Sequence, residues 1–254
     1  MIKRNLEKVV SQGKNFALTT LVTGGLLLGG HRQARAAEYN ILIIPERDVV
    51  VTGQQSYFDV GVSTSKKTLS TDFDMCINPS FIGLNEGEES ILYGGFWNGF
   101  TLDPISHVNG LTDNYIIVDI GVHGLDGPAG TGSMARFPYT AGDNPGTATV
   151  GFSFAEFVDD SLTQYTNFNG GVTTQDTTFT IVPDIQPDFN KDGFVNMEDF
   201  NVFADNMGGP DAPPLQGRAD TDLNGDGSVA LDDFVQFQRC FTGEQPVTNP
   251  NCGD

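Results

Sequence analysis

The sequence predicts a mainly β protein, in which an antiparallel β-sandwich over residues 38–182 precedes a small α-helical module over residues 188–243. Short apolar or alternating runs recur throughout the first segment, and glycine- and proline-rich turns separate them. Many short strands without alternating helices are typical of a sandwich. After Pro187 the chain changes to acidic phrases, each followed by an amphipathic run, which indicates the helical module.

The predicted strands come from alternation. Phe58, Val60 and Val62 fall on one face of an extended chain, and Asp59 and Gly61 fall on the other. Two prolines in "VPDIQP" end the last strand and make residues 183–187 a short linker. The strand segments are 39–45, 48–52, 56–63, 73–77, 114–122, 147–154 and 177–182.

Residues 1–36 have the order of a secretory signal peptide: a basic leader, an apolar run over 16–30, and small residues at Ala34 and Ala36. A membrane anchor is the alternative reading. A spanning helix needs about 20 apolar residues, whereas this run has fifteen residues, three of them threonine and four glycine. We therefore expect cleavage near Ala36, no membrane span in the mature chain, and a location outside the cell or at its surface.

The mature chain is strongly acidic. Residues 1–36 hold six of the thirteen basic residues and one of the 33 acidic ones, so the remainder carries seven basic against 32 acidic residues, a formal charge of −25. Such a surface repels phosphate backbones and anionic lipids, which disfavours nucleic acid as a partner. It attracts divalent cations.

Three cysteines are present. In an exported chain, Cys240 and Cys252 are able to close a short loop and hold the C-terminal tail over residues 244–254, although spacing alone does not establish the bond. Cys76 lies in an apolar stretch, and we expect it to be a buried free thiol.

A thirteen-residue phrase occurs twice near the C-terminus. "DFNKDGFVNMEDF" starts at Asp188, and "DLNGDGSVALDDF" starts thirty-four residues later at Asp222. Seven of the thirteen positions are identical: Asp, Asn, Asp, Gly, Val, Asp and Phe. A hydrophobic core has no use for so acidic a phrase, so its repetition indicates a binding function.

The oxygen spacing in each phrase matches a loop around a calcium ion. Ca²⁺ takes about six to eight oxygen ligands, and a loop of about twelve residues supplies them from positions 1, 3, 5, 7, 9 and 12, with a main-chain carbonyl at 7 and glycine at 6. Position 9 of the second loop is Ala230, so we expect water to complete that shell and the second of the two Ca²⁺ sites to be weaker. The predicted ligands are Asp188, Asn190, Asp192, the Phe194 carbonyl, Asn196 and Asp199 in the first loop, and Asp222, Asn224, Asp226, the Ser228 carbonyl and Asp233 in the second.

Each loop leads into a short predicted helix, because apolar residues recur three and four positions apart. No helix leads into either loop. We expect the two phenylalanine-rich faces to pack together, and Val195 and Val229, at position 8, to pair the loops. The apolar positions are Phe200, Phe203, Ala204 and Met207 in the first helix and Leu231, Phe234, Phe237 and Phe241 in the second.

With this ligand pattern, Asp at position 12, the missing entry helices and the duplication, residues 188–243 resemble a type I dockerin. The resemblance implies two Ca²⁺ ions and docking to a protein partner, such as a cohesin-type domain. In that family, positions 10 and 11 of each loop help to choose the partner. Here they are Met197 and Glu198, then Leu231 and Asp232, rather than the familiar Ser-Thr pair, which leaves the partner open.

The sandwich more weakly resembles a cohesin-like jelly roll or a carbohydrate-binding domain, through the order of its segments 56–63, 73–84 and 130–153. In the stretch "YGGFWNGF", Trp97 is the candidate for stacking on a sugar ring. The other reading is that these aromatic residues cap the core, since aromatic side chains are usually buried.

The sequence has no nucleophile elbow, phosphate-binding glycine loop or zinc spacing, although paired carboxylates of a glycoside hydrolase are not visible in a sequence. We therefore expect a secreted, non-catalytic protein that docks to another protein in a calcium-dependent way, within an extracellular or polysaccharide-degrading assembly. The alternative is a carbohydrate-binding or carbohydrate-active sandwich that the dockerin-like module merely anchors.

Overall fold

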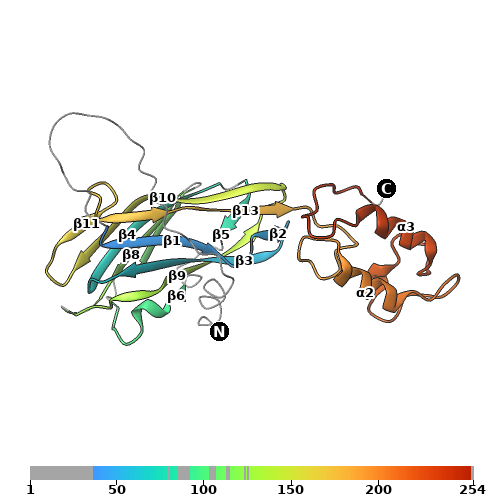
Figure 1. The fold of residues 1–254 in the computed structure, drawn as a ribbon, viewed down its shortest axis with the longest axis horizontal. Coiled ribbons are helices and arrows are strands. Elements are labelled where there is room, and N and C mark those ends of the chain that lie inside the picture. The colour runs from blue at the N-terminus through green and yellow to red at the C-terminus, as the bar shows by residue number, and fades with distance from the viewer. Residues whose placement is uncertain are drawn as a thin grey trace, which may run out of the picture. The chain divides into compact units, whose positions relative to one another are not determined.

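The computed structural model describes residues 37–78, 80–84, 92–102, 107–112, 115–122, 124 and 126–252. The expected signal peptide over 1–36 lies outside these residues. The described chain is a two-layered β-sandwich and a C-terminal segment with two α-helices (Figure 1). The predicted fold class is confirmed, and none of the described helices has the length and hydropathy of a membrane span.

The first sheet has the strand order β12-β1-β3-β9-β5, with β6 also paired to β9. These strands are β1 (Tyr39–Pro45), β3 (Gln55–Thr64), β5 (Ile82–Leu84), β6 (Leu92–Tyr93), β9 (Gly130–Ala141) and β12 (Val172–Gln175).

The second sheet has the order β2-β13-β10-β4-β8-β7, with β11 also paired to β10. These strands are β2 (Val49–Val51), β4 (Thr68–Ile77), β7 (His107–Thr112), β8 (Tyr115–Gly121), β10 (Gly146–Asp159), β11 (Gln164–Thr166) and β13 (Thr177–Val182). All seven predicted strands are present.

Two strand pairs are parallel, whereas the sequence predicts an antiparallel sandwich. Strand β1 pairs with β12 in the first sheet, and β2 pairs with β13 in the second. Each of the segments 39–51 and 172–182 starts in the first sheet and continues into the second. Because the two segments change sheets in the same direction, both of their pairings are parallel.

The core lies between the sheets and follows the predicted alternation. Phe58, Val60 and Val62 of β3 are fully buried, and aromatic side chains join the layers. Tyr39 of β1 stacks on Phe157 of β10, with 4.3 Å between the ring centroids. Burial of such side chains supplies the main stabilising free energy of a sandwich.

Strand β9 is absent from the predicted strands, although it has twelve residues and contacts β3 along its length. It contains Pro138, and proline in a central strand usually removes a hydrogen bond. Pro138 lies opposite Tyr57, whose carbonyl accepts instead from the backbone N–H of Glu46. The nitrogen of Pro138, which has no hydrogen to donate, therefore faces away from β3. On that side of β9, Pro138 lies between the residues that pair with β5 and those that pair with β6.

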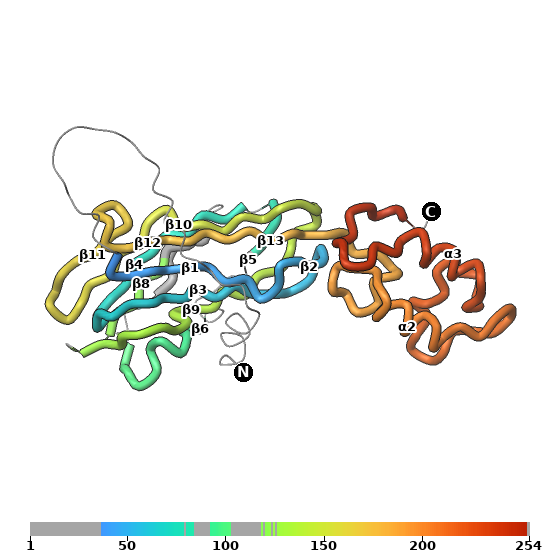
Figure 2. The backbone as a smooth tube through the Cα atoms, in the orientation of Figure 1, coloured from blue at the N-terminus to red at the C-terminus, as the bar shows by residue number. Residues whose placement is uncertain are grey.

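The C-terminal module contains α2 (Met197–Asn206), the 3₁₀ turn η3 (Ala219–Thr221) and α3 (Leu231–Cys240). In Figure 2 the tube follows each acidic loop into its helix, and the chain after α3 then turns back. A separate hydrophobic cluster fills the module, and it includes Ile185 and Val247 from the segments on either side of residues 188–243. Its buried members are Ile185, Val195, Phe203, Val229, Phe237, Cys240 and Val247.

Candidate metal centre

The two acidic loops, 188–199 (first loop) and 222–233 (second loop), share most of their internal hydrogen bonds. The carboxylate at position 12 accepts from the backbone at position 2: Asp199 Oδ1 from Phe189 N at 2.8 Å, and Asp233 Oδ1 from Leu223 N at 2.8 Å. The other carboxylate oxygen accepts from the backbone at position 9: Asp199 Oδ2 from Asn196 N at 3.0 Å, and Asp233 Oδ2 from Ala230 N at 2.8 Å. Each Asp is thus fixed at the start of its helix.

The carboxylate at position 1 closes each loop from the other end. Asp188 Oδ2 accepts from Gly193 N at 2.9 Å, and Asp222 Oδ2 accepts from Gly227 N at 2.8 Å. Both glycines have positive φ, +89° and +92°, a conformation that strains any residue with a Cβ. This explains the glycine at position 6 of both phrases.

Three carboxylates converge in the first loop. One oxygen each of Asp188, Asp192 and Asp199 lies within 4.8 Å of the others, and Asp188 and Asp199 are fully buried. Burial, together with the nearby charge of Asp199, raises the pKa of Asp188 to about 6, against hydrogen bonds from the backbone N–H groups of Gly193 and Asp192 that lower it. The pKa of Asp199 is raised as well, chiefly by burial.

This arrangement fits a hard divalent cation. Buried like charges at such separations repel one another unless a proton or a cation offsets them. Carboxylate, amide and carbonyl oxygens are the ligands that Ca²⁺ prefers, and the loop offers all three kinds.

The second loop is more open. Asp222 is partly exposed, whereas its counterpart Asp188 is fully buried. The three corresponding carboxylates of the second loop, all within the described chain, do not form a group as close as that of the first. The Ser228 hydroxyl donates to Asp226 at 2.7 Å and is the main cause of the lowered pKa of Asp226.

The residues predicted to choose a partner lie at the start of the helices. Met197 and Leu231, at position 10, have exposed fractions of 57% and 72%. At position 11, Glu198 and Asp232 are also exposed. Each of these carboxylates accepts from the amide of the asparagine at position 3 of its own loop, at 3.2 Å and 2.7 Å, so the candidate docking residues and the candidate metal ligands are directly linked.

The side chains of Val195 and Val229, expected to point inward and pair the loops, lie in the same hydrophobic cluster, while their carbonyls bond to other segments. Val195 and Val229 are fully buried, but the carbonyl of Val195 accepts from Thr242 N at 2.9 Å and that of Val229 from Gly208 N at 3.1 Å. Thr242 follows α3 and Gly208 follows α2. Each loop therefore bonds to the end of the other unit's helix.

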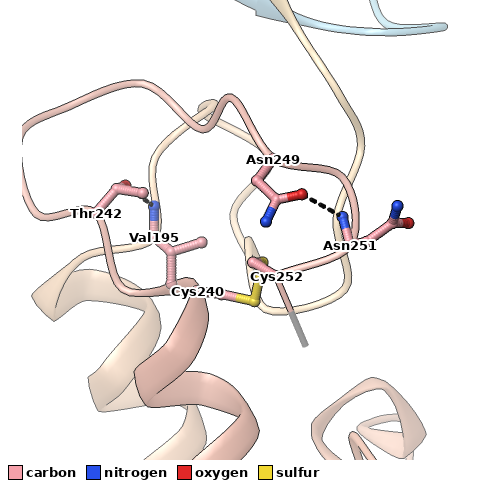
Figure 3. The surroundings of a disulfide bond; sticks show 6 residues. All are labelled: Val195, Cys240, Thr242, Asn249, Asn251 and Cys252. Atoms are coloured by element: carbon pink, nitrogen blue, oxygen red, sulfur yellow. Dashed lines mark hydrogen bonds between the residues drawn. A yellow bond between two sulfur atoms is a disulfide. The ribbon is translucent and has the colours of Figure 1, made fainter. Parts of the chain in front are cut away.

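A disulfide joins Cys240, the last residue of α3, to Cys252 (Figure 3). The tail between them contains Thr242 and Val247, which contact the first loop and which the sequence analysis does not single out. The cysteine spacing is the only sequence signal for these contacts. Cys76 is a free thiol and only partly buried.

Trp97, the candidate sugar-stacking residue, is buried in the sandwich. It lies in the 3₁₀ turn η2 (Gly95–Trp97), is 3% exposed, and donates from Nε1 to the carbonyl of Met134 at 3.1 Å. Phe96 packs edge-to-face against it. No face of the indole is open to a sugar ring, and this geometry favours the reading that the aromatic stretch caps the core.

No protein-family profile matches the sequence, and no curated protein matches it. The solved structures with a similar fold include cohesin domains. A non-cellulosomal cohesin from Archaeoglobus fulgidus is 16% identical, with a TM-score of 0.43 over 57% of this chain and 92% of that one. A type II cohesin from Acetivibrio cellulolyticus is 13% identical, with a TM-score of 0.47 over 56% and 94%. A type I cohesin from Clostridium thermocellum, solved in a cohesin–dockerin complex, is 11% identical, with a TM-score of 0.47 over 61% and 100%.

Proposed function

We propose that this chain is an exported, non-catalytic protein whose C-terminal module binds two Ca²⁺ ions and docks, in a calcium-dependent way, to another protein outside the cell or at its surface. The observation that carries this proposal is the duplicated loop. Two segments with the same oxygen spacing have the same hydrogen bonds at positions 1 and 12, a repetition that ordinary solvated turns do not require.

In the first loop, Asp188, Asn190, Asp192, Asn196, Asp199 and the Phe194 carbonyl would hold the ion; in the second, Asp222, Asn224, Asp226, Asp233 and the Ser228 carbonyl would do so. A bound cation offsets the charge of the buried carboxylates and allows the module to fold around them. It also orders position 11 of each loop, because Asn190 and Asn224 bridge the loop carboxylates to Glu198 and Asp232. Metal binding would thus prepare the docking surface.

Calcium binding is tested by equilibrium dialysis and calorimetry of the full chain. We expect two ions per chain, with the first site tighter because Asn196 stands where the second loop has Ala230. One ion or none would contradict the proposal, and equal affinities would contradict the role of position 9.

The docking surface consists of Met197, Glu198, Leu231 and Asp232. Exposed aliphatic side chains next to carboxylates are suited to a protein partner with an apolar patch and basic residues. The resemblance of the module to a dockerin makes cohesin domains the first partners to test. The assembly would be extracellular, for example one that degrades polysaccharide.

The docking test measures binding of the immobilised full chain to a panel of type I and type II cohesin domains. We expect binding in Ca²⁺ that is lost in chelator and weakened about tenfold or more by Leu231→Asp or Met197→Asp. Leu215→Asp, an exposed aliphatic position in the connection between the two loop–helix units, is the matched control. Binding that survives chelation would exclude a calcium-dependent mode, and a panel without any binder would exclude cohesins as the partner class.

A second candidate function, sugar binding by the sandwich, is favoured by one observation. Phe168 is 78% exposed and stacks on Phe154 with 6.0 Å between the ring centroids. Its turn is held by the side chain of Asn169, whose Oδ1 accepts from Thr166 N and Gly171 N at 2.9 Å each. A rigidly presented aromatic ring is a suitable platform for a pyranose ring.

Affinity electrophoresis in gels that contain soluble polysaccharides tests the second candidate. Retardation that is lost in Phe168→Ala and retained in Leu162→Ala, an exposed aliphatic control, would support it. Equal mobility of the wild-type chain in all gels would leave docking as the function.

A further inference from the structure

The peptide group that supplies the position-7 carbonyl of the first loop is held from outside the loop. The N–H of Val195 belongs to the same peptide group as the carbonyl of Phe194, and it donates to Oγ1 of Thr242 at 3.2 Å. In a trans peptide the C=O and N–H point in opposite directions. The Thr242 hydroxyl therefore sets the direction of the candidate ligand carbonyl.

The preceding peptide group is held by the same tail. Val247 donates from its N–H to the carbonyl of Gly193 at 2.9 Å, and the N–H of that peptide group, on Phe194, donates to Asp192 Oδ1 at 3.0 Å. Two consecutive peptide groups of the first loop, at the sharp turn and at the carbonyl ligand, are thus fixed by Thr242 and Val247.

Both tail residues lie inside the loop that the Cys240–Cys252 disulfide closes, with a sequence separation of twelve residues. Val247 is 2% exposed and belongs to the hydrophobic cluster of the module, to which Cys252 also packs. Figure 3 shows the tail between the cysteines, with Thr242 facing Val195 and Asn249 accepting from Asn251 N next to the disulfide. The disulfide is the covalent restraint on this segment, and its other contacts with the module include the Val247 side chain and the hydrogen bonds to Gly193 and Val195.

The second loop is supported differently. The N–H of Val229, in the peptide group of the Ser228 carbonyl, donates to the carbonyl of Ala212 at 3.2 Å, which lies in the connection after α2. Within the described chain, no backbone N–H is found on the carbonyl of Gly227, the counterpart of Gly193. The stretch from Met207 to Ala230 that gives this support contains no cysteine, so the supports of the two loops lie in different parts of the chain.

We infer that the disulfide-closed tail, residues 240–252, positions the ligand carbonyl of the first loop, so that the Cys240–Cys252 bond controls the Ca²⁺ affinity of the first site and leaves that of the second unchanged. This inference rests on the proposed calcium binding. Groups that orient a metal ligand typically contribute about 10- to 100-fold to metal affinity. Opening the disulfide would therefore lower the Ca²⁺ affinity of the first site until it equals that of the second site or falls below it.

The test follows the backbone amides of Gly193 and Gly227 by NMR during Ca²⁺ titration of the full chain, because each donates to the position-1 carboxylate of its own loop. In the variant Cys240→Ala/Cys252→Ala, we expect the titration midpoint of Gly193 to rise about tenfold or more and that of Gly227 to change less than about twofold. Hydrogen exchange of the Val247 amide, measured with both sites saturated by Ca²⁺, should accelerate in the same variant, which reports release of the tail independently of the titration midpoints.

A second variant keeps the disulfide and the fold. Thr242→Val removes the hydroxyl acceptor at nearly constant volume and should raise the Gly193 midpoint, whereas Thr248→Val, an exposed threonine of the same tail, should leave it unchanged. An unchanged Gly193 midpoint in Thr242→Val, or equal shifts of both glycines in the cysteine variant, would overturn the inference. If neither glycine of the wild-type chain responds to Ca²⁺, the proposed calcium binding fails instead.

Discussion

Phe203 of α2 and Phe237 of α3 stack at the centre of the C-terminal module, with 5.5 Å between their ring centroids and 23° between the ring planes. Both side chains are at most 1% exposed. Phe200 and Phe234 lie 5.9 Å from each other beside this pair, at 6.0 Å from Phe237 and 6.1 Å from Phe203. The two loop–helix units therefore share one aromatic core, and loss of a ring from either helix weakens the packing of both helices.

This shared core predicts the effect of truncating either ring. Phe203→Ala or Phe237→Ala should lower the free energy of unfolding of the module by about 3–5 kcal/mol, because each removes a fully buried aromatic side chain. Thermal unfolding in excess Ca²⁺, followed by near-UV circular dichroism and calorimetry, measures the loss. Phe241→Ala is the matched control, since that ring lies in the same module and is 44% exposed. A comparable loss in the control would mean that burial is not the cause.

Removal of the position-1 carboxylates should unfold the module. In Asp188→Ala/Asp222→Ala, neither loop retains the group that closes it or its first metal ligand, and the aromatic core alone is too small to hold the helices. We expect the amide signals of residues 188–243 to lose their dispersion in NMR spectra. Asp205→Ala/Glu244→Ala, at exposed positions outside both loops, should keep it. A dispersed loop variant would show that metal does not organise the module, and an undispersed control would show that loss of acidic side chains outside the loops is enough to unfold it.

The first site should respond to pH. The pKa of Asp188 is raised to about 6, above the value of about 4 in an unfolded chain. Ca²⁺ must displace the bound proton, so the affinity of the first site should fall as the pH drops below about 6. Equilibrium dialysis at about pH 7.5 and about pH 5 measures this directly, and equal affinities at the two values would contradict it.

The metal-free module should show the opposite trend. Because the folded state holds the Asp188 proton more tightly than the unfolded state, the stability from this group is fully present below about pH 4 and is lost as the pH rises through about 6. Far-UV circular dichroism of the full chain in chelator measures the folded fraction of the module across this pH range. In the variant Asp188→Asn, the side chain has no proton to release in this pH range. The stability of the module should therefore depend less on pH in this variant.

Substitution of Trp97 should destabilise the sandwich without affecting any binding of polysaccharide. Trp97→Ala removes a side chain that is 3% exposed and leaves the carbonyl of Met134 without its donor, which should cost about 3–5 kcal/mol. Unfolding of the sandwich, followed by Trp-independent circular dichroism, measures the cost. Unchanged stability together with lost retardation in polysaccharide gels would restore the sugar-stacking role.

The candidate metal centre is readable in the sequence because its determinants are local. A twelve-residue loop places oxygen atoms by chain spacing alone, and the glycine at position 6 is required by the local backbone conformation, as the positive φ of Gly193 and Gly227 shows. The strands with clear alternation, such as 39–45 and 177–182, coincide with β1 and β13 for the same reason.

Other features depend on contacts between residues far apart in the chain. Strand β9 has a proline at position 138, and only the pairing of its neighbours makes that proline acceptable. The parallel pairs arise because two distant segments change sheets together. Trp97 is buried because a turn brings it onto Met134, thirty-seven residues away.

The same division applies within the module. Its sequence by itself determined which oxygen atoms are available to an ion and which faces of the helices are apolar, since both follow from spacing along a short segment. Only the tertiary structure decided that each loop bonds to the end of the opposite helix, and that Thr242 and Val247 fix the first loop. Backbone hydrogen-bonding groups are the same at every residue, so no sequence pattern records which of them meet.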